Sequence, residues 1–300
     1  MLKDFFKLNG HYQTFKTDEE FLDKLRHGNL RDALYEPSDL GPAQPYKTLK
    51  IKEKKINNVS FSKTKLYRIV FIDCSFEDCL FIGTEIENCE FHNCKFINCN
   101  THKIKISKTY INPNNFSKCF NKIGQANIAV HLYHQLINNL TDEVQSDFRR
   151  IAVYNFYKWK DKLSLNKFWN GKPDKISLFV FLKQYPLSWL YRYTFGYGLR
   201  LRNFIFSFLA VFLLFFVLNC VFWQEYGLTT NNSLPVNVFD KDSVSTSSNF
   251  YYTLDAATKL VDSPFQVTTD FGIILLIIQS FVGFIFLSAL IAIIINRFVK

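Results

Sequence analysis

The sequence predicts a chain in two parts, a stack of short β-strands followed by helices, two of which cross a membrane. Two observations carry this fold class. From Ile56 to Phe116 every fifth residue is large and apolar, with one exception. Two later stretches, Asn203 to Gln224 and Phe271 to Asn296, carry no charge over 22 and 26 residues. Since a helix crosses a bilayer core with about 20 apolar residues, each stretch is long enough to be a span.

The composition excludes a disordered chain and locates the charge. Of the 300 residues 48% are hydrophobic and 17% aromatic, which is enough to bury a core. The segment from Arg149 to Arg202 holds twelve Lys or Arg against two acids, so it accounts for the whole formal net charge of +10. This basic segment contains three tryptophans and directly precedes the first span. It therefore favours a lipid bilayer with an anionic inner leaflet as its partner, and not a nucleic acid.

The five-residue period fits neither a helix nor a strand. Two positions before each centre stands a residue that is mostly small or β-branched, and five of the seven cysteines occupy such positions. A coil with four faces of five residues, each placing one large and one small side chain inward, explains this pattern. The centres are Ile56, Phe61, Leu66, Phe71, Phe76, Phe81, Ile86, Phe91, Phe96, Thr101, Ile106, Ile111 and Phe116.

These residues resemble the pentapeptide-repeat family, whose pattern has Phe or Leu at the centre and Ala, Cys or Ser two residues before it. The resemblance implies a right-handed quadrilateral β-helix over residues 51–118, here called the repeat region. Cysteines twenty residues apart, such as Cys74 and Cys94, then stack inside as packing residues, and we expect no metal site. With seven basic against six acidic residues from Ile56 to Phe116, the region is expected to dock an unidentified cytosolic protein partner instead of mimicking DNA.

The flanking segments show helix signals. Thr17 and Glu20 form a capping box that opens a helix ending near Gly28. Apolar faces predict two further helices, from Ala126 to Leu140 and from Asp142 to Leu163. The predicted domains are residues 1–50 (N-terminal cap), 51–118 (β-helix), 119–163 (α-helical hairpin), 164–202 (basic aromatic juxtamembrane segment) and 203–300 (two-span α-helical membrane pore module).

Charge next to the spans predicts the orientation. Arg200 and Arg202 precede the first span, while Arg297 and Lys300 follow the second. By the positive-inside rule both termini are cytosolic. Because the opening residues lack the apolar region of a signal peptide, we expect a multi-pass protein of the cytoplasmic (inner) membrane whose front half stays in the cytosol.

The 46 residues between the spans, Glu225 to Asp270, include a short semi-polar helix at residues 249–258. Span, short helix, loop and span resemble the pore module of the two-transmembrane ion-channel family. The resemblance implies a re-entrant pore helix, a homotetramer, and a filter. The filter-like residues are Thr258, Lys259, Leu260, Val261, Asp262 and Ser263. Because this segment lacks the filter glycines, we expect weak selectivity for cations through Asp262 and no potassium selectivity.

Four residues of the second span are candidate pore-lining or hinge residues: Gln279, Ser280, Gly283 and Ser288. Polar side chains in a span face protein or water, so they line a conduit or a dry helix interface. Gly283 fits a gating hinge and close helix packing equally. Thr194 to Gly198 spells T-F-G-Y-G just before the first span, where we predict a juxtamembrane turn and not a filter.

The sequence contains no HExxH, GxxxxGK or GxSxG motif, so we predict neither an enzyme nor a cofactor. The first hypothesis is a membrane ion-channel-like protein, weakly selective for cations, with a cytosolic repeat domain that senses or docks a partner. The alternatives are a non-conducting membrane-anchored scaffold that displays the repeat domain to a cytosolic partner, and a membrane-permeabilising defence effector.

Overall fold

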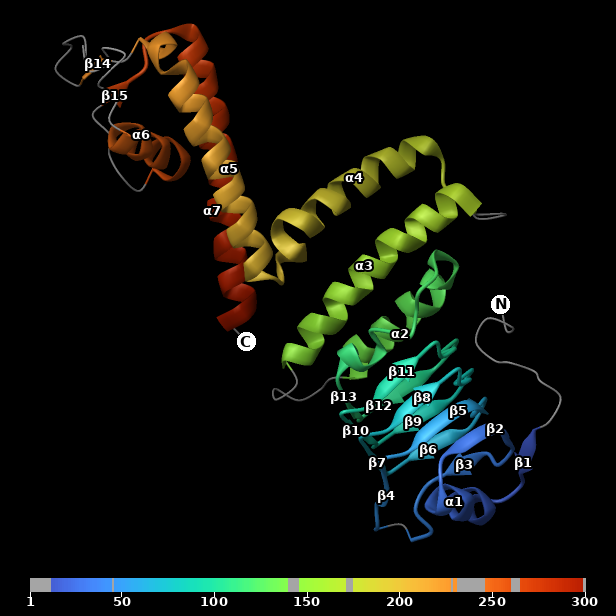
Figure 1. Cartoon of the computed structure of the whole chain (residues 1–300). Coiled ribbons are helices and arrows are strands. Elements are labelled where there is room, and N and C mark those ends of the chain that lie inside the picture. The colour runs from blue at the N-terminus through green and yellow to red at the C-terminus, as the bar shows by residue number, and fades with distance from the viewer. Residues whose placement is uncertain are drawn as a thin grey trace. The chain divides into compact units, whose positions relative to one another are not determined.

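The computed structural model describes residues 12–44, 46–139, 146–170, 175–227, 229–230, 246–259 and 265–298. The chain separates into two compact units, Met1–Pro186 and Leu187–Lys300. Parallel β-sheets and a helical hairpin make up most of the first unit, and α5, α6 and α7 make up most of the second (Figure 1). The boundary lies inside α4, so the structure divides the chain before the predicted start of the membrane module at residue 203.

The strands are short and nearly all belong to the first unit. They are β1 (Gln13–Phe15), β2 (Leu30–Tyr35), β3 (Asp39–Leu40), β4 (Leu49–Lys52), β5 (Lys55–Ser60), β6 (Lys65–Tyr67), β7 (Ile69–Ile72), β8 (Ser75–Glu77), β9 (Glu85–Glu87), β10 (Glu90–His92), β11 (Lys95–Ile97), β12 (Lys105–Ser107), β13 (Tyr110–Ile111), β14 (Thr229–Thr230) and β15 (Phe265–Gln266). The α-helices are α1 (Asp18–His27), α2 (Ala126–Asn139), α3 (Ser146–Asn170), α4 (Leu178–Phe195), α5 (Leu201–Phe222), α6 (Thr246–Thr258) and α7 (Asp270–Phe298).

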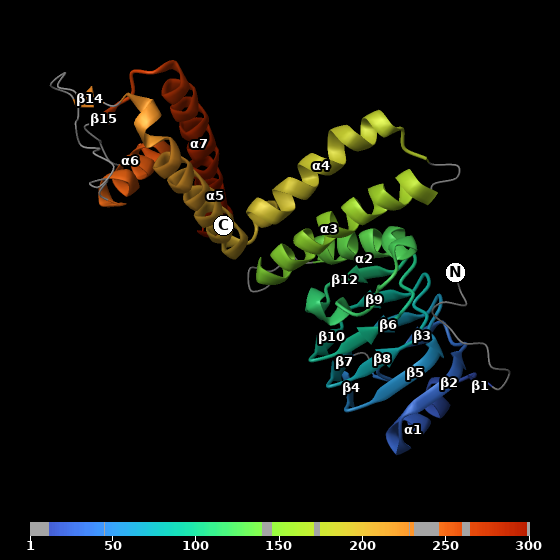
Figure 2. The ribbon, with the colours of Figure 1, turned by 45° about the horizontal axis from the view of Figure 1, so that its top comes forward.

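Three parallel sheets form the repeat region and the strands before it (Figure 2). Their orders are β1-β2-β5-β8-β11, β13-β10-β7-β4 and β12-β9-β6-β3. Paired residues in the repeat region are twenty apart, as when Phe76 pairs with Phe96. On a further side the chain makes single bridges that join Ser60 to Leu80 and Leu80 to Asn100. The predicted stack of short parallel strands is therefore confirmed.

Large side chains at the repeat centres fill the interior. The rings of Phe76 and Phe96 stack with centroids 4.8 Å apart, and Phe96 stacks on Phe116 at 4.4 Å. The cysteines of the repeat region are buried, and their thiols donate to backbone carbonyls, as the Cys79 thiol does to Ile56 at 3.4 Å. Burial raises the pKa of the Cys89 thiol to about 11. Cys89 is therefore a neutral packing residue.

Left-handed backbone turns the chain at a regular interval that sequence analysis did not single out. After each of the first eleven centres, from Ile56 to Ile106, the residue two positions later has a φ between 48° and 66°. Asn, Asp and Gly tolerate this conformation best. Asn and Asp side chains at these positions also bond along the stack, as Asn93 does to Asp73 at 2.5 Å. These turning positions are Asn58, Lys63, Arg68, Asp73, Asp78, Gly83, Asn88, Asn93, Asn98, Lys103 and Lys108.

Helix α1 covers one end of the sheets. The Thr17 hydroxyl accepts the Glu20 N–H at 3.3 Å, and the helix ends at His27 before Gly28, as predicted. Phe21 is 1% exposed, and its ring lies edge-on to Phe61 with centroids 5.8 Å apart. The apolar face of α1 therefore closes the interior at the first repeat.

Helix α2 covers the other end through one amide side chain. Asn139 accepts the Thr109 N–H at 2.9 Å and donates to the Thr109 carbonyl at 2.7 Å. Because both groups are buried, this amide takes the place that a further strand would occupy. The paired helix α3 continues to Asn170, beyond the predicted end at Leu163, because Phe168 finds a stacking partner in Phe181 at 4.3 Å. The predicted start of α3, at Asp142, falls outside the described residues.

Candidate functional site

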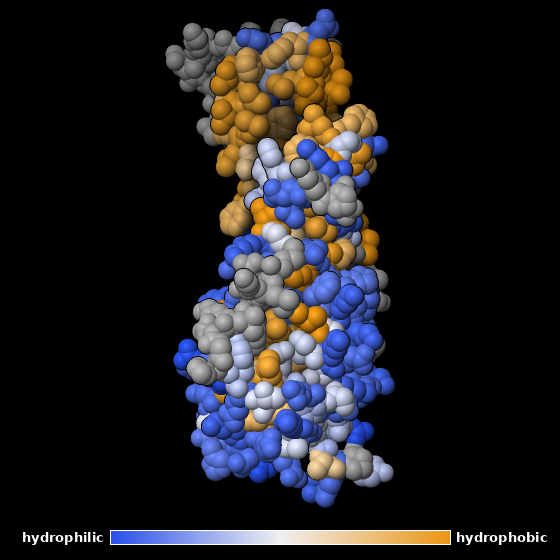
Figure 3. Space-filling model, turned by 90° about the vertical axis from the view of Figure 1, so that its right-hand side faces the viewer, coloured by the Kyte–Doolittle hydropathy of each residue, from blue (hydrophilic) through white to orange (hydrophobic). Residues whose placement is uncertain are grey.

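Two helices of the second unit are long and apolar enough to cross a membrane. The candidate spans are Leu201–Phe222 in α5 and Asp270–Ile295 in α7. Most of their large apolar side chains point away from the unit, and Figure 3 shows hydrophobic residues gathered over it. The view of the β-sheets in the same figure is largely hydrophilic. A lipid environment is the solvent that suits such an exposed apolar surface.

The two candidate spans are antiparallel and meet through aromatic rings. Phe222 at the end of α5 lies beside Phe271 at the start of α7, with centroids 5.3 Å apart. Near the other end Phe286 contacts both Phe204 and Phe208 at 5.8 Å. The hairpin therefore has a packed aromatic end where the chain enters α5.

Between the spans, at the other end, α6 is held by a group of buried polar side chains. Asn219 of α5 donates to the Thr253 hydroxyl at 2.8 Å and to the Gln279 side-chain oxygen at 3.2 Å. Gln279 in turn donates to the Thr253 carbonyl at 3.0 Å. All three are at most 1% exposed. One amide on each span thus bonds the same residue of α6.

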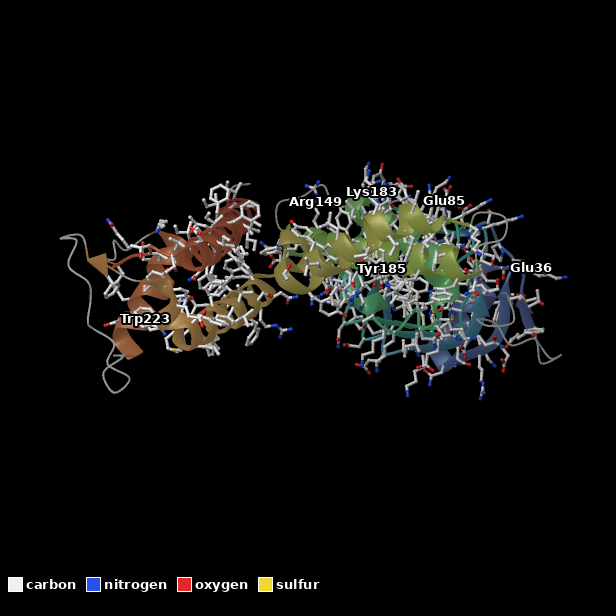
Figure 4. All side chains as sticks on the ribbon, turned by 90° about the horizontal axis from the view of Figure 1, so that it is seen from above. Glu36, Glu85, Arg149, Lys183, Tyr185 and Trp223 are labelled. Atoms are coloured by element: carbon white, nitrogen blue, oxygen red, sulfur yellow. The ribbon has the colours of Figure 1, made fainter. Side chains whose placement is uncertain are left out.

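Two more buried residues complete this group, which we call the polar cluster (Asn219, Tyr226, Asn249, Thr253 and Gln279). The Tyr226 hydroxyl donates to Asn219 at 2.8 Å, and Thr253 donates to Asn249 at 3.1 Å. The Trp223 ring packs beside Tyr252, with centroids 5.5 Å apart, and covers the cluster. Figure 4 shows Trp223 among the side chains of this unit. Polar side chains away from water are costly unless bonded to one another, so the cluster fixes the position of α6.

The C-terminal end of α6 rests on the middle of α7. A β-carbon added to Gly283 would stand 1.7 Å from the Ala257 carbonyl oxygen, so only glycine permits this approach. The Ser280 hydroxyl donates to the neighbouring Ala256 carbonyl at 3.0 Å. Gly283 lies halfway along the candidate span, about 20 Å along the helix axis from Asp270. The end of α6 is thus level with the centre of that span.

After α6 the chain returns to the end of the hairpin where α7 starts. Phe265 packs against Trp223, with centroids 6.0 Å apart, and β15 pairs antiparallel with β14. The Thr268 and Thr269 hydroxyls donate to the carbonyls of Gly227 and Glu225 at 2.5 and 2.7 Å. Helix α6 therefore ends level with the middle of the candidate span, and residues 265–269 lie at the end where α7 starts.

Only the first two of the filter-like residues lie within the described chain. The Thr258 hydroxyl donates to the Leu254 carbonyl of its own helix at 2.7 Å. The Lys259 ammonium lies 3.5 Å from the Asp255 carboxylate one turn earlier. Leu260, Val261, Asp262 and Ser263 fall outside the described residues. Lys259, the first residue after α6, is therefore charge-paired with a residue of that helix, a geometry that the sequence analysis did not consider.

The four candidate residues of the second span separate into two groups. Gln279, Ser280 and Gly283 all face α6 within the same chain, through the contacts given above. Ser288 is exposed and shares its face of α7 with the exposed Phe281, Phe284 and Ile291. Of the four, Ser288 is the exposed residue, whereas Ser280 is half-buried and Gln279 and Gly283 are buried.

The T-F-G-Y-G segment is a turn between α4 and α5, as predicted. Gly196, Tyr197 and Gly198 have φ values of 55°, 59° and 72°, so three successive residues are left-handed. The preceding Phe195 packs on Phe286 of α7, with centroids 5.3 Å apart. The Asn203 amide donates to the Arg192 carbonyl at 3.3 Å, which satisfies the end of α4.

Sequence reasoning missed Asn219 and Tyr226, and it took Asn249 only as the cap of the short helix, which in the structure begins earlier, at Thr246. An amide in an otherwise apolar span was a usable signal at Asn219, because such a group must find a partner. Its partners are 34 and 60 residues away in the sequence, so their identity needed the structure. Among the described residues no group of three or more His, Cys, Asp or Glu side chains could hold a metal ion.

No family model matches the chain, and no curated protein matches it.

Proposed function

We propose that this protein is a membrane ion-channel-like protein, weakly selective for cations, whose cytosolic repeat region docks a protein partner. The observation that carries the proposal is the path of α6, which ends against Gly283 at mid-span before the chain returns to the end it came from. A short helix that enters a bilayer and turns back is stable only when protein or a water-filled cavity covers its open end. The path of α6 is therefore typical of a pore wall.

Charge supports cation preference. The C-terminal end of a helix carries a partial negative charge from its unbonded carbonyls. At mid-span that end of α6 would stabilise a cation where the bilayer otherwise opposes it most. The pairing of Lys259 with Asp255 reduces the opposing positive charge at this end, and Asp262 would add a carboxylate.

The conduit is proposed to lie between copies of the chain, in a homotetramer. Within the described part of one copy, contacts between α5, α6 and α7 occupy the space around the polar cluster and Gly283, so we place the conduit outside it. The face of α7 that carries Ser288 is exposed in one copy. Four such faces around one axis would enclose a narrow, mainly apolar pore with one polar ring.

The orientation and the lipid partner follow from α4 and its continuation. No described residue of α4 is buried, and its exposed side chains include Phe179, Leu182 and Leu187. From Lys175 to Gln224 the chain has five cations and no acid. We propose that α4 lies at the cytosolic surface of the inner membrane against anionic lipid, with both termini in the cytosol.

The repeat region is proposed to be a closed right-handed quadrilateral β-helix. Its support is the offset of twenty residues between paired strands, which the bridges through Leu80 share. Four sides of five residues give this offset when the chain turns at each left-handed position. A closed stack leaves its outer faces free to dock a partner.

Ion flux from liposomes tests the channel. We expect cation flux from wild type, increased cation preference in Lys259→Asp, and reduced preference in Asp262→Asn. The surface variant Lys95→Asp is the control and should match wild type. If both filter variants behave as wild type, the filter assignment is wrong.

Modification of Ser288→Cys tests the pore wall. Cys220 is the exposed cysteine of the described chain, so the substitution is made in a Cys220→Ala background. We expect a charged thiol reagent to block flux through Ser288→Cys and to leave the background unaffected. Flux that persists after complete labelling would place the conduit elsewhere.

The sequestration of Gln279, Ser280 and Gly283 inside one copy also suits a second candidate, a non-conducting scaffold anchored by the hairpin. The mass of the protein in detergent separates the two functions. A tetramer with flux supports the channel, whereas a monomer or dimer without flux supports the scaffold. Flux that appears only after a trigger would indicate a membrane-permeabilising effector.

A further inference from the structure

Strand β4 leaves one backbone edge open at the end of its sheet. In the described chain its one strand partner is β7. The N–H groups of Leu49 and Glu53 donate to Arg68 and Ile72 carbonyls at 3.0 and 2.9 Å, toward β7. Because alternate residues of a strand point their backbone groups to opposite sides, Lys50 and Lys52 direct theirs to the free edge. This edge can accept another strand.

A groove of about 90 Å³ runs between this edge and α1. Its apolar residues are Leu22, Leu25, Leu49 and Ile51, and the others are Arg26, Lys50, Lys52 and Lys54. The Lys54 ammonium donates to the Arg26 carbonyl at 3.2 Å, which holds the end of α1 beside the strand. The eight residues lining this groove, here called the β4 groove, thus include four cations and no acid.

We propose that the β4 groove binds an extended acidic segment of a partner protein, which adds to β4 as a further strand. Backbone bonds to Lys50 and Lys52 would fix the segment, as in other strand additions. Its acidic side chains would lie beside the exposed ammonium groups of Lys50 and Lys52. The alternate side chains, next to Ile51, would be apolar and enter the groove over Leu22.

Charge decides against a second copy of this chain as the occupant. Pairing two β4 edges would bring Lys50 and Lys52 of one copy against the same residues of the other, and like charges opposite one another are destabilising. Edge lysines of this kind prevent self-association. The same charges attract a strand of opposite sign, which makes the edge selective for an acidic partner.

Binding of a synthetic peptide tests the proposal on the full chain in detergent. The probe is a fluorescent peptide of alternating Glu and Val, and its matched control replaces each Glu by Lys. We expect the Glu peptide to bind at low salt and the Lys peptide not to bind. Lys50→Glu/Lys52→Glu should weaken binding at least tenfold, while the matched variant Lys95→Glu/Lys103→Glu, elsewhere on the repeat region, should change it less than twofold.

Alternate N-methylation separates strand addition from simple ion pairing. Methyl groups on the peptide edge that faces β4 should abolish binding, and methyl groups on the other edge should not. Equal binding of the two methylated peptides, or equal binding by the wild type and Lys50→Glu/Lys52→Glu, would overturn the proposal. Ion flux is measured separately, so neither result bears on the channel.

Discussion

Gly283 of α7 and Ala257 of α6 are in backbone contact, and a β-carbon at position 283 would overlap the Ala257 carbonyl. The sequence leaves open whether Gly283 is a gating hinge or a site of close helix packing, and this contact distinguishes the two roles. A hinge needs a residue with conformational freedom, whereas this site needs one without a side chain. The geometry therefore favours packing.

Gly283→Ala should destabilise the second unit although alanine is the better helix former. Helix propensity favours alanine by about 1 kcal/mol, but overpacking against backbone costs about 1–3 kcal/mol and α6 must move. We expect a lower unfolding temperature in detergent and loss of flux. The control is Gly124→Ala, where no atom lies within 4 Å of the added carbon. An unfolding temperature equal to that of wild type would contradict the packing role.

Asn219→Leu should loosen α6 from both spans. The substitution leaves the Tyr226 hydroxyl and the Gln279 side-chain oxygen without the bonds they make to Asn219. The expected cost is about 1–2 kcal/mol, since polar contacts in membranes are weaker than those in water-soluble cores. Val221→Leu, on an exposed position of the same helix, is the control. The readout is protease sensitivity of α6, and equal sensitivity of both variants would argue against the role of Asn219.

Two buried threonines of the repeat region should respond in opposite directions to the same change. The Thr101 hydroxyl has no hydrogen-bond partner among the described residues, so Thr101→Val should stabilise by about 1 kcal/mol. The Thr84 hydroxyl donates to the Phe61 carbonyl at 2.6 Å, so Thr84→Val should destabilise by about 1–3 kcal/mol. Urea denaturation followed by far-ultraviolet circular dichroism measures both. Shifts of the same sign would be inconsistent with this assignment.

Asn139→Ala should open the end of the repeat region, because the buried Thr109 N–H and carbonyl lose their partner. We expect a loss of about 1–3 kcal/mol and faster amide hydrogen exchange at Thr109. The adjacent Asn138 is exposed, so Asn138→Ala is a matched control with no expected effect. Unchanged exchange at Thr109 in Asn139→Ala would rule out the capping role.

The Cys89 thiol should make the repeat region less stable in alkali. Burial raises its pKa from 9.0 to about 11 in the folded chain. Between these values the unfolded chain has lost the proton and the folded chain keeps it, so stability decreases as the pH rises through this window. The effect approaches about 2–3 kcal/mol. Cys89→Ala should remove that part of the slope between pH 9 and 11, and an identical slope in the variant would contradict the shift.

The repeat region was predictable because its pattern is local. A period of five, read from Ile56 onward, identifies the buried positions without knowledge of their neighbours. The turning positions could also have been predicted from the sequence, since Asn, Asp or Gly stands at most of them. Asn139 was not predictable, because its bond to Thr109 depends on where the hairpin settles.

The two long apolar helices were predictable from the absence of charge, and the interior of the second unit was not. The sequence shows that Gln279 is polar in an apolar helix, but it does not show that Thr253 is its partner. The sequence does not show that Lys259 lies beside Asp255, as it does in the structure. Such pairings depend on tertiary packing, which no local pattern encodes.

Because paired strands are offset by twenty residues, the length of the repeat region can change only by multiples of twenty residues. Removing or duplicating twenty consecutive residues within it keeps every inward side chain inward and both terminal covers intact. An insertion or deletion whose length is not a multiple of twenty would shift the register of all the strands that follow it. Natural or engineered variants can therefore lengthen the repeat region only by twenty residues at a time.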